Sequence, residues 1–151
     1  MNTSEKVKEW FDSADCDIKE ARAELNEGGR LYIGSMCHQT IEYALKAIIT
    51  HVTNREELYK SSDLLILAEK AQLTAKMSNE HLDFIKELNF LHMEASYFEY
   101  MGMVMDRHSE EYLHKIVEGT ADLLYWIKKQ LPIMSINKNS KVIYLYHRTR
   151  S

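Results

Sequence analysis

Apolar residues recur at intervals of three and four along most of the chain, which is the pattern of amphipathic α-helices. The clearest example runs from Arg30 to Val52, with no proline and with no glycine after Gly34. The small residues Ala44 and Ala47 would let a neighbouring helix approach closely. We therefore expect a central helix on which the other elements pack. Its apolar face comprises Ile33, Met36, Cys37, Ile41, Ala44, Leu45, Ile48, Ile49 and Val52.

The same periodicity predicts a first helix before the central one. Ser4 can cap its N-terminus, and its apolar positions continue to about Asn26. The pair Gly28 and Gly29 can supply the positive φ that ends a helix and reverses the chain. The first and central helices should form an antiparallel hairpin.

Three further helices are predicted after the hairpin. Ser61 or Ser62 can cap a short helix over residues 63–73, and Ser78 can start another whose inward positions reach about Met93. Asp106 or Ser109 can cap the last long helix, which Pro132 should stop. Between these last two helices, residues 95–106 are expected to form an irregular connection pressed against the protein. The β-branched and aromatic residues 141–148 are the one strand-like run.

Composition agrees with long helices, because the 151 residues include only five glycines and one proline. The net charge is −4, but residues 133–151 contain four basic residues and no acid, so the rest of the chain carries −8. An acidic body argues against strong DNA binding by the whole surface, whereas the basic tail leaves a local contact with nucleic acid open. No apolar run approaches the length of a membrane span, so no membrane contact is expected, and we expect a cytoplasmic protein.

The cysteines and histidines do not show the spacings of common redox or metal sites. Cys16 and Cys37 lack a Cys-x-x-Cys spacing, and we interpret both as core-filling thiols. The seven histidines show no metal-binding spacing. His38 on the central helix could contact a ligand, but it fits better as a hydrogen-bonded group at the edge of a core. His81 and His92 are too far apart in the pattern to suggest a metal pair. No cofactor is therefore expected.

Several stretches, taken in order, resemble the HEPN family of four- to five-helix domains. The resemblance covers roughly residues 7–131, and its strongest part is the central-helix motif that begins at Gln39. The stretches are Trp10 with Ala14–Ile18, Gln39–Ala47, Ser62–Ala68, Leu88–Tyr97 and Leu123–Lys129.

The resemblance implies an all-α, up-and-down four- to five-helix bundle over residues 1–132, followed by a basic, strand-like tail over residues 133–151. HEPN domains include metal-independent endoribonucleases of toxin or defence systems. Others are non-catalytic modules that bind nucleotides, RNA or proteins. The resemblance also implies a homodimer, with RNA or a nucleotide as ligand and with an antitoxin or a nucleotidyltransferase-like protein as a candidate partner.

The ribonuclease members share an arginine followed, after four to six residues, by a histidine near the start of the last helix. Arg107 and His114 match that motif with a six-residue gap, and His108 supplies the polar neighbour. An arginine can hold a phosphate through paired donors, and a histidine can move a proton for attack by a ribose 2′-hydroxyl. The resemblance thus makes Arg107, His114 and His108 candidate catalytic residues.

A non-catalytic interpretation stays open. Arg107 could pair with Glu110 or Glu111, and these acids would repel a phosphate. The chain also departs from its relatives, with Ser62 where many have histidine and Ser96 where many have arginine.

Two further groups could contact RNA. The methionines and aromatics of residues 93–105 could form a stacking platform for bases, although such a cluster is more often part of a core or a dimer interface. In the tail, Lys141, Arg148 and Arg150 alternate with aromatic residues, which suits RNA binding. A tail that contacts a partner or that is poorly ordered is the favoured interpretation.

Overall fold

The computed structural model of the chain describes residues 2–102 and 108–135, apart from the side chains of residues 56, 58 and 132–135. Within these ranges the chain is helical, with five α-helices and two short 3-10 helices. The elements are α1 (Thr3–Asn26), α2 (Ile33–Val52), η1 (Glu56–Tyr59), α3 (Leu64–Lys70), η2 (Thr74–Lys76), α4 (Asn79–Tyr100) and α5 (Glu110–Ser135).

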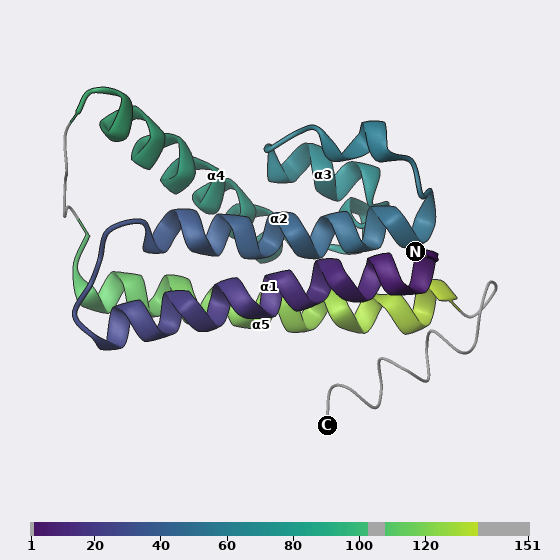
Figure 1. Cartoon of the computed structure of the whole chain (residues 1–151), viewed down its shortest axis with the longest axis horizontal. Coiled ribbons are helices and arrows are strands. Elements are labelled where there is room, and N and C mark those ends of the chain that lie inside the picture. The colour runs from purple at the N-terminus through teal and green to yellow at the C-terminus, as the bar shows by residue number, and fades with distance from the viewer. Residues whose placement is uncertain (1, 103–107, 136–151) are drawn as a thin grey trace.

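Helix α2 is the centre of the bundle, as its wide apolar face predicts. It packs on α1 and α5 on one side and on α3 and α4 on the other (Figure 1). Ile41, Leu45 and Ile48 have no exposed surface. Burying each such side chain contributes about 1.5–3 kcal/mol, so this helix supplies a large part of the stabilising burial. The predicted all-α bundle is confirmed.

The α1–α2 hairpin forms as expected, with small differences at its ends. Asn2 caps α1 in place of Ser4, because its side-chain oxygen accepts a hydrogen bond from the Glu5 amide at 2.8 Å. Helix α1 ends at Asn26, and Gly28 follows with a φ of +87°, a conformation that glycine adopts without strain. Helix α2 begins at Ile33, three residues later than Arg30.

The next two helices show one unexpected cap and one expected cap. Asp63 itself caps α3, accepting from the Leu65 amide at 2.9 Å, whereas the Ser61 hydroxyl accepts from the Asp63 amide. Ser78 caps α4 as predicted, and the His81 side chain returns a bond to the Ser78 amide.

Helix α4 corrects the prediction for residues 95–106. Residues 95–100 continue the helix to Tyr100, because nothing before Gly102 interrupts it. This segment is also not pressed against the protein, since no residue of α4 after Leu91 is buried. In Figure 1 the C-terminal half of α4 extends away from α2. Residues 103–106 lie outside the described part of the chain.

Helix α4 crosses α2 at Gly34. A Cβ atom added to Gly34 would lie 2.9 Å from the Leu91 Cβ, closer than two such carbons approach without a shift. Glycine therefore permits this crossing, which is also where α4 makes its last buried contact.

The last helix begins as predicted, with the Ser109 hydroxyl accepting from the Tyr112 amide at 3.1 Å. Asp106, the alternative cap, is not among the described residues. The expectation that Pro132 stops the helix is wrong, because α5 continues to Ser135. Proline's fixed φ is compatible with a helix, so its missing N–H removes one hydrogen bond without ending the turn.

The strand-like residues 141–148 also lie beyond the described ranges. Among the helices that are described, none combines the length and the apolar character that crossing a membrane requires.

Candidate functional site at the start of α5

His108 immediately precedes the α5 cap, and a carboxylate on α4 holds it. Its Nε2 lies 2.9 Å from Oε1 of Glu94, and the two side chains are 30% and 12% exposed. This pair connects the residue before the α5 cap to α4. It also fixes the orientation of a half-buried imidazole that solvent can still reach.

A tyrosine and a second carboxylate extend this arrangement. The Tyr112 hydroxyl donates to Oε2 of Glu87 at 2.5 Å, and its ring lies 5.0 Å from that of His108. Burial, followed by the bond to Glu87, raises the pKa of Tyr112 well above its usual value. Tyr112 therefore remains a hydrogen-bond donor that positions Glu87 beside the start of α5.

His114 is more open to solvent. Its side chain is 51% exposed, and its Nε2 lies 3.6 Å from Oε1 of Glu110, which is too long for a hydrogen bond. Lys115 and Glu111, both largely exposed, form a loose pair at 4.0 Å. His114 is thus accessible to a ligand, but the carboxylate of Glu110 lies close to it.

The two described histidines of the predicted site, His108 and His114, have different surroundings. His108 is held by Glu94, whereas His114 lies near Glu110. Arg107 lies outside the described residues, so the geometry of the arginine–histidine motif stays a prediction. The same holds for the predicted RNA contacts of Lys141, Arg148 and Arg150.

The sequence did not reveal Glu94, Glu87 and Tyr112 as members of this site. Glu94 lies in one of the stretches that resemble HEPN domains, but no periodicity pairs it with His108. That contact depends on how α4 and α5 meet, which no local pattern encodes.

A second polar cluster lies between α2 and α4. The rings of His38 and His92 are stacked with centroids 4.2 Å apart, and His38 is only 1% exposed. Its Nδ1 is 3.7 Å from Glu42, which forms a 2.7 Å ion pair with Lys46. Burial, together with the His92 ring, lowers the pKa of His38. His38 is therefore a buried group of the core, as the sequence favoured, and is not open to a ligand. His92, to which the sequence assigned no role, stacks on its ring.

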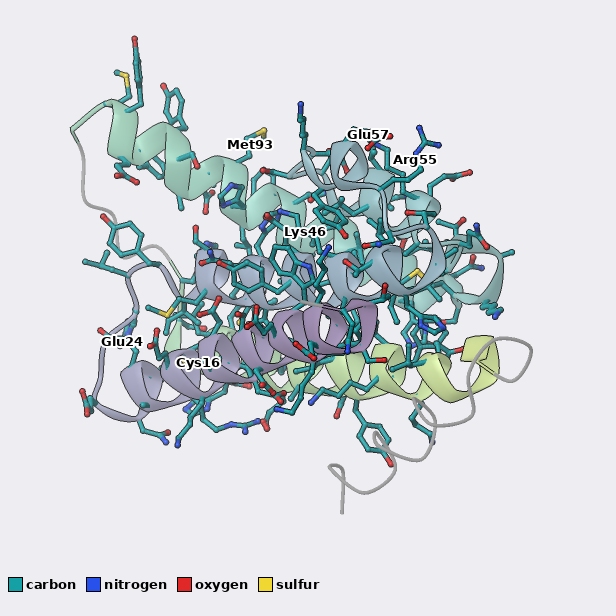
Figure 2. The ribbon with its side chains drawn as sticks, turned by 45° about the vertical axis from the view of Figure 1, so that its right-hand side comes forward. Cys16, Glu24, Lys46, Arg55, Glu57 and Met93 are labelled. Atoms are coloured by element: carbon teal, nitrogen blue, oxygen red, sulfur yellow. The ribbon has the colours of Figure 1, made fainter. Side chains whose placement is uncertain are left out.

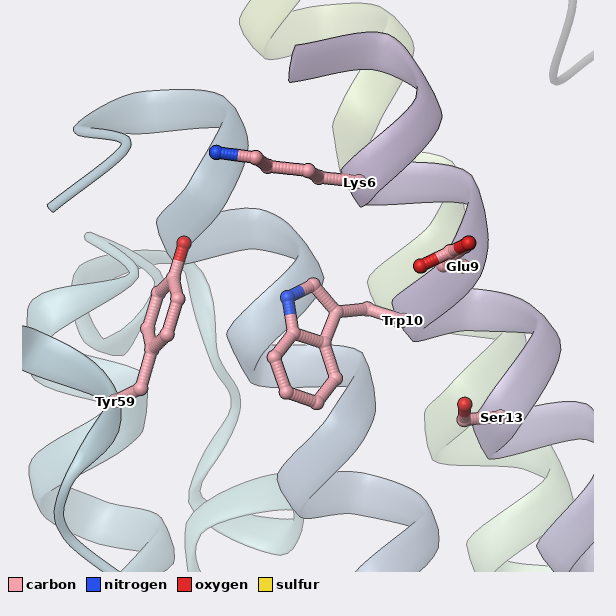
Figure 3. Close-up of a pocket in the computed structure, with 5 residues that line it drawn as sticks. All are labelled: Lys6, Glu9, Trp10, Ser13 and Tyr59. Carbon is pink, nitrogen blue, oxygen red and sulfur yellow. The ribbon is translucent and has the colours of Figure 1, made fainter. Parts of the chain in front are cut away.

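A small pocket of about 230 Å³ lies at the other end of the bundle, near the start of α1 (Figure 3). Ligand pockets usually span roughly 300–1,000 Å³, so this one is small. The Trp10 ring is already in contact with Tyr43 and Tyr59 and with the Lys46 ammonium. These contacts favour a packing role. The pocket is lined by Lys6, Glu9, Trp10, Ser13 and Tyr59.

The cysteines differ from each other. Cys37 is buried as expected, and burial raises the pKa of its thiol to about 11, which suppresses reactivity. Cys16 is exposed on α1, so the expectation that it fills the core is wrong (Figure 2). No group of three or more candidate metal ligands occurs within the described ranges.

Comparison with protein families identifies the fold. The family model described as the HEPN domain matches residues 7–130. The chain belongs to the HEPN family. No curated protein and no solved structure matches it. In this HEPN protein the match begins within α1 and ends within α5, so it covers all or most of every described helix and includes His108 and His114.

Proposed function

We propose that this HEPN protein is a metal-independent endoribonuclease that acts through residues at the start of α5. The observation that supports the proposal most is the 2.9 Å contact between His108 and Glu94. A carboxylate that holds an imidazole at a partly exposed position fixes the orientation that proton transfer requires. Arg107 and His114 match the family's ribonuclease motif in the adjoining residues.

The proposed reaction is an internal transfer of the phosphoryl group. Arg107 holds the scissile phosphate, and His114 accepts the proton of the ribose 2′-hydroxyl as that oxygen bonds to phosphorus. The bond from phosphorus to the 5′-oxygen breaks, and protonated His108 supplies a proton to the leaving oxygen. The products are a 2′,3′-cyclic phosphate and a 5′-hydroxyl, so charge and protons balance without an external reactant.

The second candidate is a non-catalytic module that binds RNA, a nucleotide or a protein. Its support is the acidic character of the same surface, where Glu110 is the charged neighbour of His114 and Glu111 is largely exposed. Carboxylates in these positions repel phosphate and would suit a basic protein partner. An antitoxin or a nucleotidyltransferase-like protein would be such a partner. For either function we expect a homodimer in the cytoplasm.

Incubation of purified protein with mixed RNA in EDTA tests the enzyme proposal. We expect cleavage by the parent and a loss of at least about 100-fold in both Arg107→Ala and His114→Ala, since general acid–base groups typically contribute 10²- to 10⁴-fold. His51→Ala, at the C-terminal end of α2, is the matched control and should cleave normally.

Two outcomes would contradict the assignment. Cleavage that persists in both variants would place the activity elsewhere in the chain. An inactive parent that still binds RNA, a nucleotide or a protein would favour the non-catalytic module.

A further inference from the structure

The small pocket near the start of α1 contains polar groups that have no partner within the described part of the chain. Lys6, Glu9, Trp10, Ser13 and Tyr59 line its space of about 230 Å³. Among the described residues, no charged group pairs with the Lys6 ammonium or with the Glu9 carboxylate. The packing of Trp10 against Tyr59 holds both rings in place, so they form fixed walls. A preformed space with apolar walls and a few unused polar groups is typical of a ligand site.

Two hydrogen-bond donors converge on one side of this pocket. Figure 3 shows the Lys6 ammonium and the indole nitrogen of Trp10 directed toward the space beside the Tyr59 hydroxyl. The indole N–H is not buried, and no residue of the described chain accepts its proton. An ammonium and an indole N–H can only donate, so together they suit the carboxylate of a ligand.

The Tyr59 hydroxyl has the opposite role and acts as an acceptor. The Thr50 hydroxyl donates its single proton to the Lys46 carbonyl at 2.8 Å, and the Thr50 oxygen is also in short contact with the Tyr59 hydroxyl. Tyr59 must therefore donate its own proton to Thr50, because Thr50 has no second proton to give. The remaining lone pair of the Tyr59 oxygen is available to a donor in the pocket. The exposed Glu9 carboxylate is a second acceptor.

The charges of the pocket favour a ligand that carries both signs. Lys6 contributes one positive charge and Glu9 one negative charge. Lys46, which lies over the Trp10 ring, is already paired with Glu42 at 2.7 Å. A phosphate would be attracted by Lys6 but repelled by Glu9, whereas a zwitterion satisfies both groups. The small volume excludes a drug-sized molecule.

We infer that this pocket binds a small zwitterion with an apolar side chain, which is the chemistry of a free α-amino acid or of a short peptide. The ligand carboxylate accepts hydrogen bonds from Lys6 and Trp10, and the ligand ammonium donates to Tyr59 and Glu9. The apolar side chain of the ligand packs on the two aromatic rings. The inference does not rest on RNA cleavage, because none of these residues belongs to the candidate site at the start of α5.

Trp10 reports on binding once Trp126, the second tryptophan of the chain, is replaced. In a Trp126→Phe background, L-leucine should change the Trp10 fluorescence with a Kd on the order of 1 mM, as suits a few contacts in a small pocket. Circular dichroism establishes that the variant is folded. Amide chemical shifts of the unaltered chain are a second measurement, and the largest changes should fall in residues 6–13 and at Tyr59.

Matched probes separate the two charges of the ligand. Isocaproate lacks the ammonium of L-leucine and isoamylamine lacks its carboxylate, so each should bind at least about tenfold more weakly. Leucylglycine keeps both charges but places them farther apart, and its affinity relative to L-leucine distinguishes a peptide from a free amino acid. AMP should bind more weakly than L-leucine, because Glu9 repels its phosphate.

Substitutions on α1 test the roles of the two charged residues. Lys6→Met should weaken the binding of L-leucine at least about tenfold. Lys8→Met is the matched control and should bind like the parent, because Lys8 is exposed and pairs with Asp12 at 2.8 Å. Glu9→Gln should weaken the binding of L-leucine but strengthen that of isocaproate, because it removes the repulsion between two carboxylates.

Four results would overturn the inference. They are no binding of L-leucine or leucylglycine, equal binding of L-leucine and isocaproate, tighter binding of AMP than of L-leucine, and a Lys6→Met variant that binds L-leucine like the parent. None of them depends on whether the protein cleaves RNA, so the pocket and the ribonuclease can fail separately.

Discussion

The inner face of α2 and the outer half of α4 have similar apolar patterns but opposite environments. Ile41, Leu45 and Ile48 are completely buried among neighbouring helices, whereas Tyr97 and Tyr100 are mostly exposed. The difference shows that periodicity identifies a face that must be covered without identifying what covers it. For α2 the cover belongs to the same chain, whereas the described part of the chain leaves the outer half of α4 uncovered.

Truncation of one residue in each region gives the largest expected contrast. Ile41→Ala should lower the free energy of unfolding by about 2–5 kcal/mol, because it leaves a cavity in the core. Tyr100→Ala should change the same quantity by less than about 0.5 kcal/mol in dilute protein, as expected for an exposed site. Urea titration measures both. A large loss for Tyr100→Ala in the monomer would mean that the outer half of α4 is part of the core.

The crossing at Gly34 is the next place to test. Gly34→Ala should destabilise the protein by about 1–3 kcal/mol, because the new methyl group would overlap Leu91. Ser35→Ala, one position along α2, is the control and should be nearly neutral. If Gly34→Ala were instead stabilising, as helix propensity alone predicts, α4 would not be held tightly at this point.

The buried His38 ring should make the stability of the folded protein sensitive to acid. Because its pKa is lowered in the folded state, the unfolded chain binds more protons as the pH falls through about 6.5, and stability decreases. We expect the melting temperature to fall on acidification from pH 8 to pH 5, and less steeply in His38→Asn. Equal slopes in the two proteins would show that other groups dominate the response.

The smallest effect on stability is expected for an ion pair on the surface of the bundle, between α1 and α5. Arg22 on α1 contacts both carboxylate oxygens of Glu118 on α5, at 2.9 and 2.8 Å, but both side chains are about half exposed. A double-mutant cycle with Arg22→Ala and Glu118→Ala should therefore give a coupling of only about 0.2–1 kcal/mol. A coupling above about 2 kcal/mol would show that ion pairs, as well as apolar burial, stabilise the packing of α1 on α5.

Local signals in the sequence predicted much of the bundle. The periodicity placed α2, the glycines placed the end of α1, and Ser78 and Ser109 cap the helices that they were expected to cap. The extent of α4 differs from the prediction, because the aromatic and methionine residues near Gly102 predict an irregular connection, whereas α4 continues to Tyr100. Such residues are compatible with a helix when one face is exposed.

The candidate site was only partly predictable for a different reason. His108 and His114 follow from a sequence motif, but the contact of His108 with Glu94 joins residues that are 14 positions apart in the sequence. The stacked rings of His38 and His92 likewise depend on the crossing of α2 and α4. Both contacts arise from the packing of whole helices, which the spacing of residues within one helix does not determine.

The order of the helices has a consequence for how the chain folds. Helices α1 and α2 are neighbours in the chain and pack against each other, so their hairpin closes a short loop and can form quickly. Helix α5 reaches the same core only after η1, α3, η2 and α4, and it must close a much longer loop. We therefore expect substitutions in the α1–α2 seam to slow refolding, and those in α5 mainly to speed unfolding.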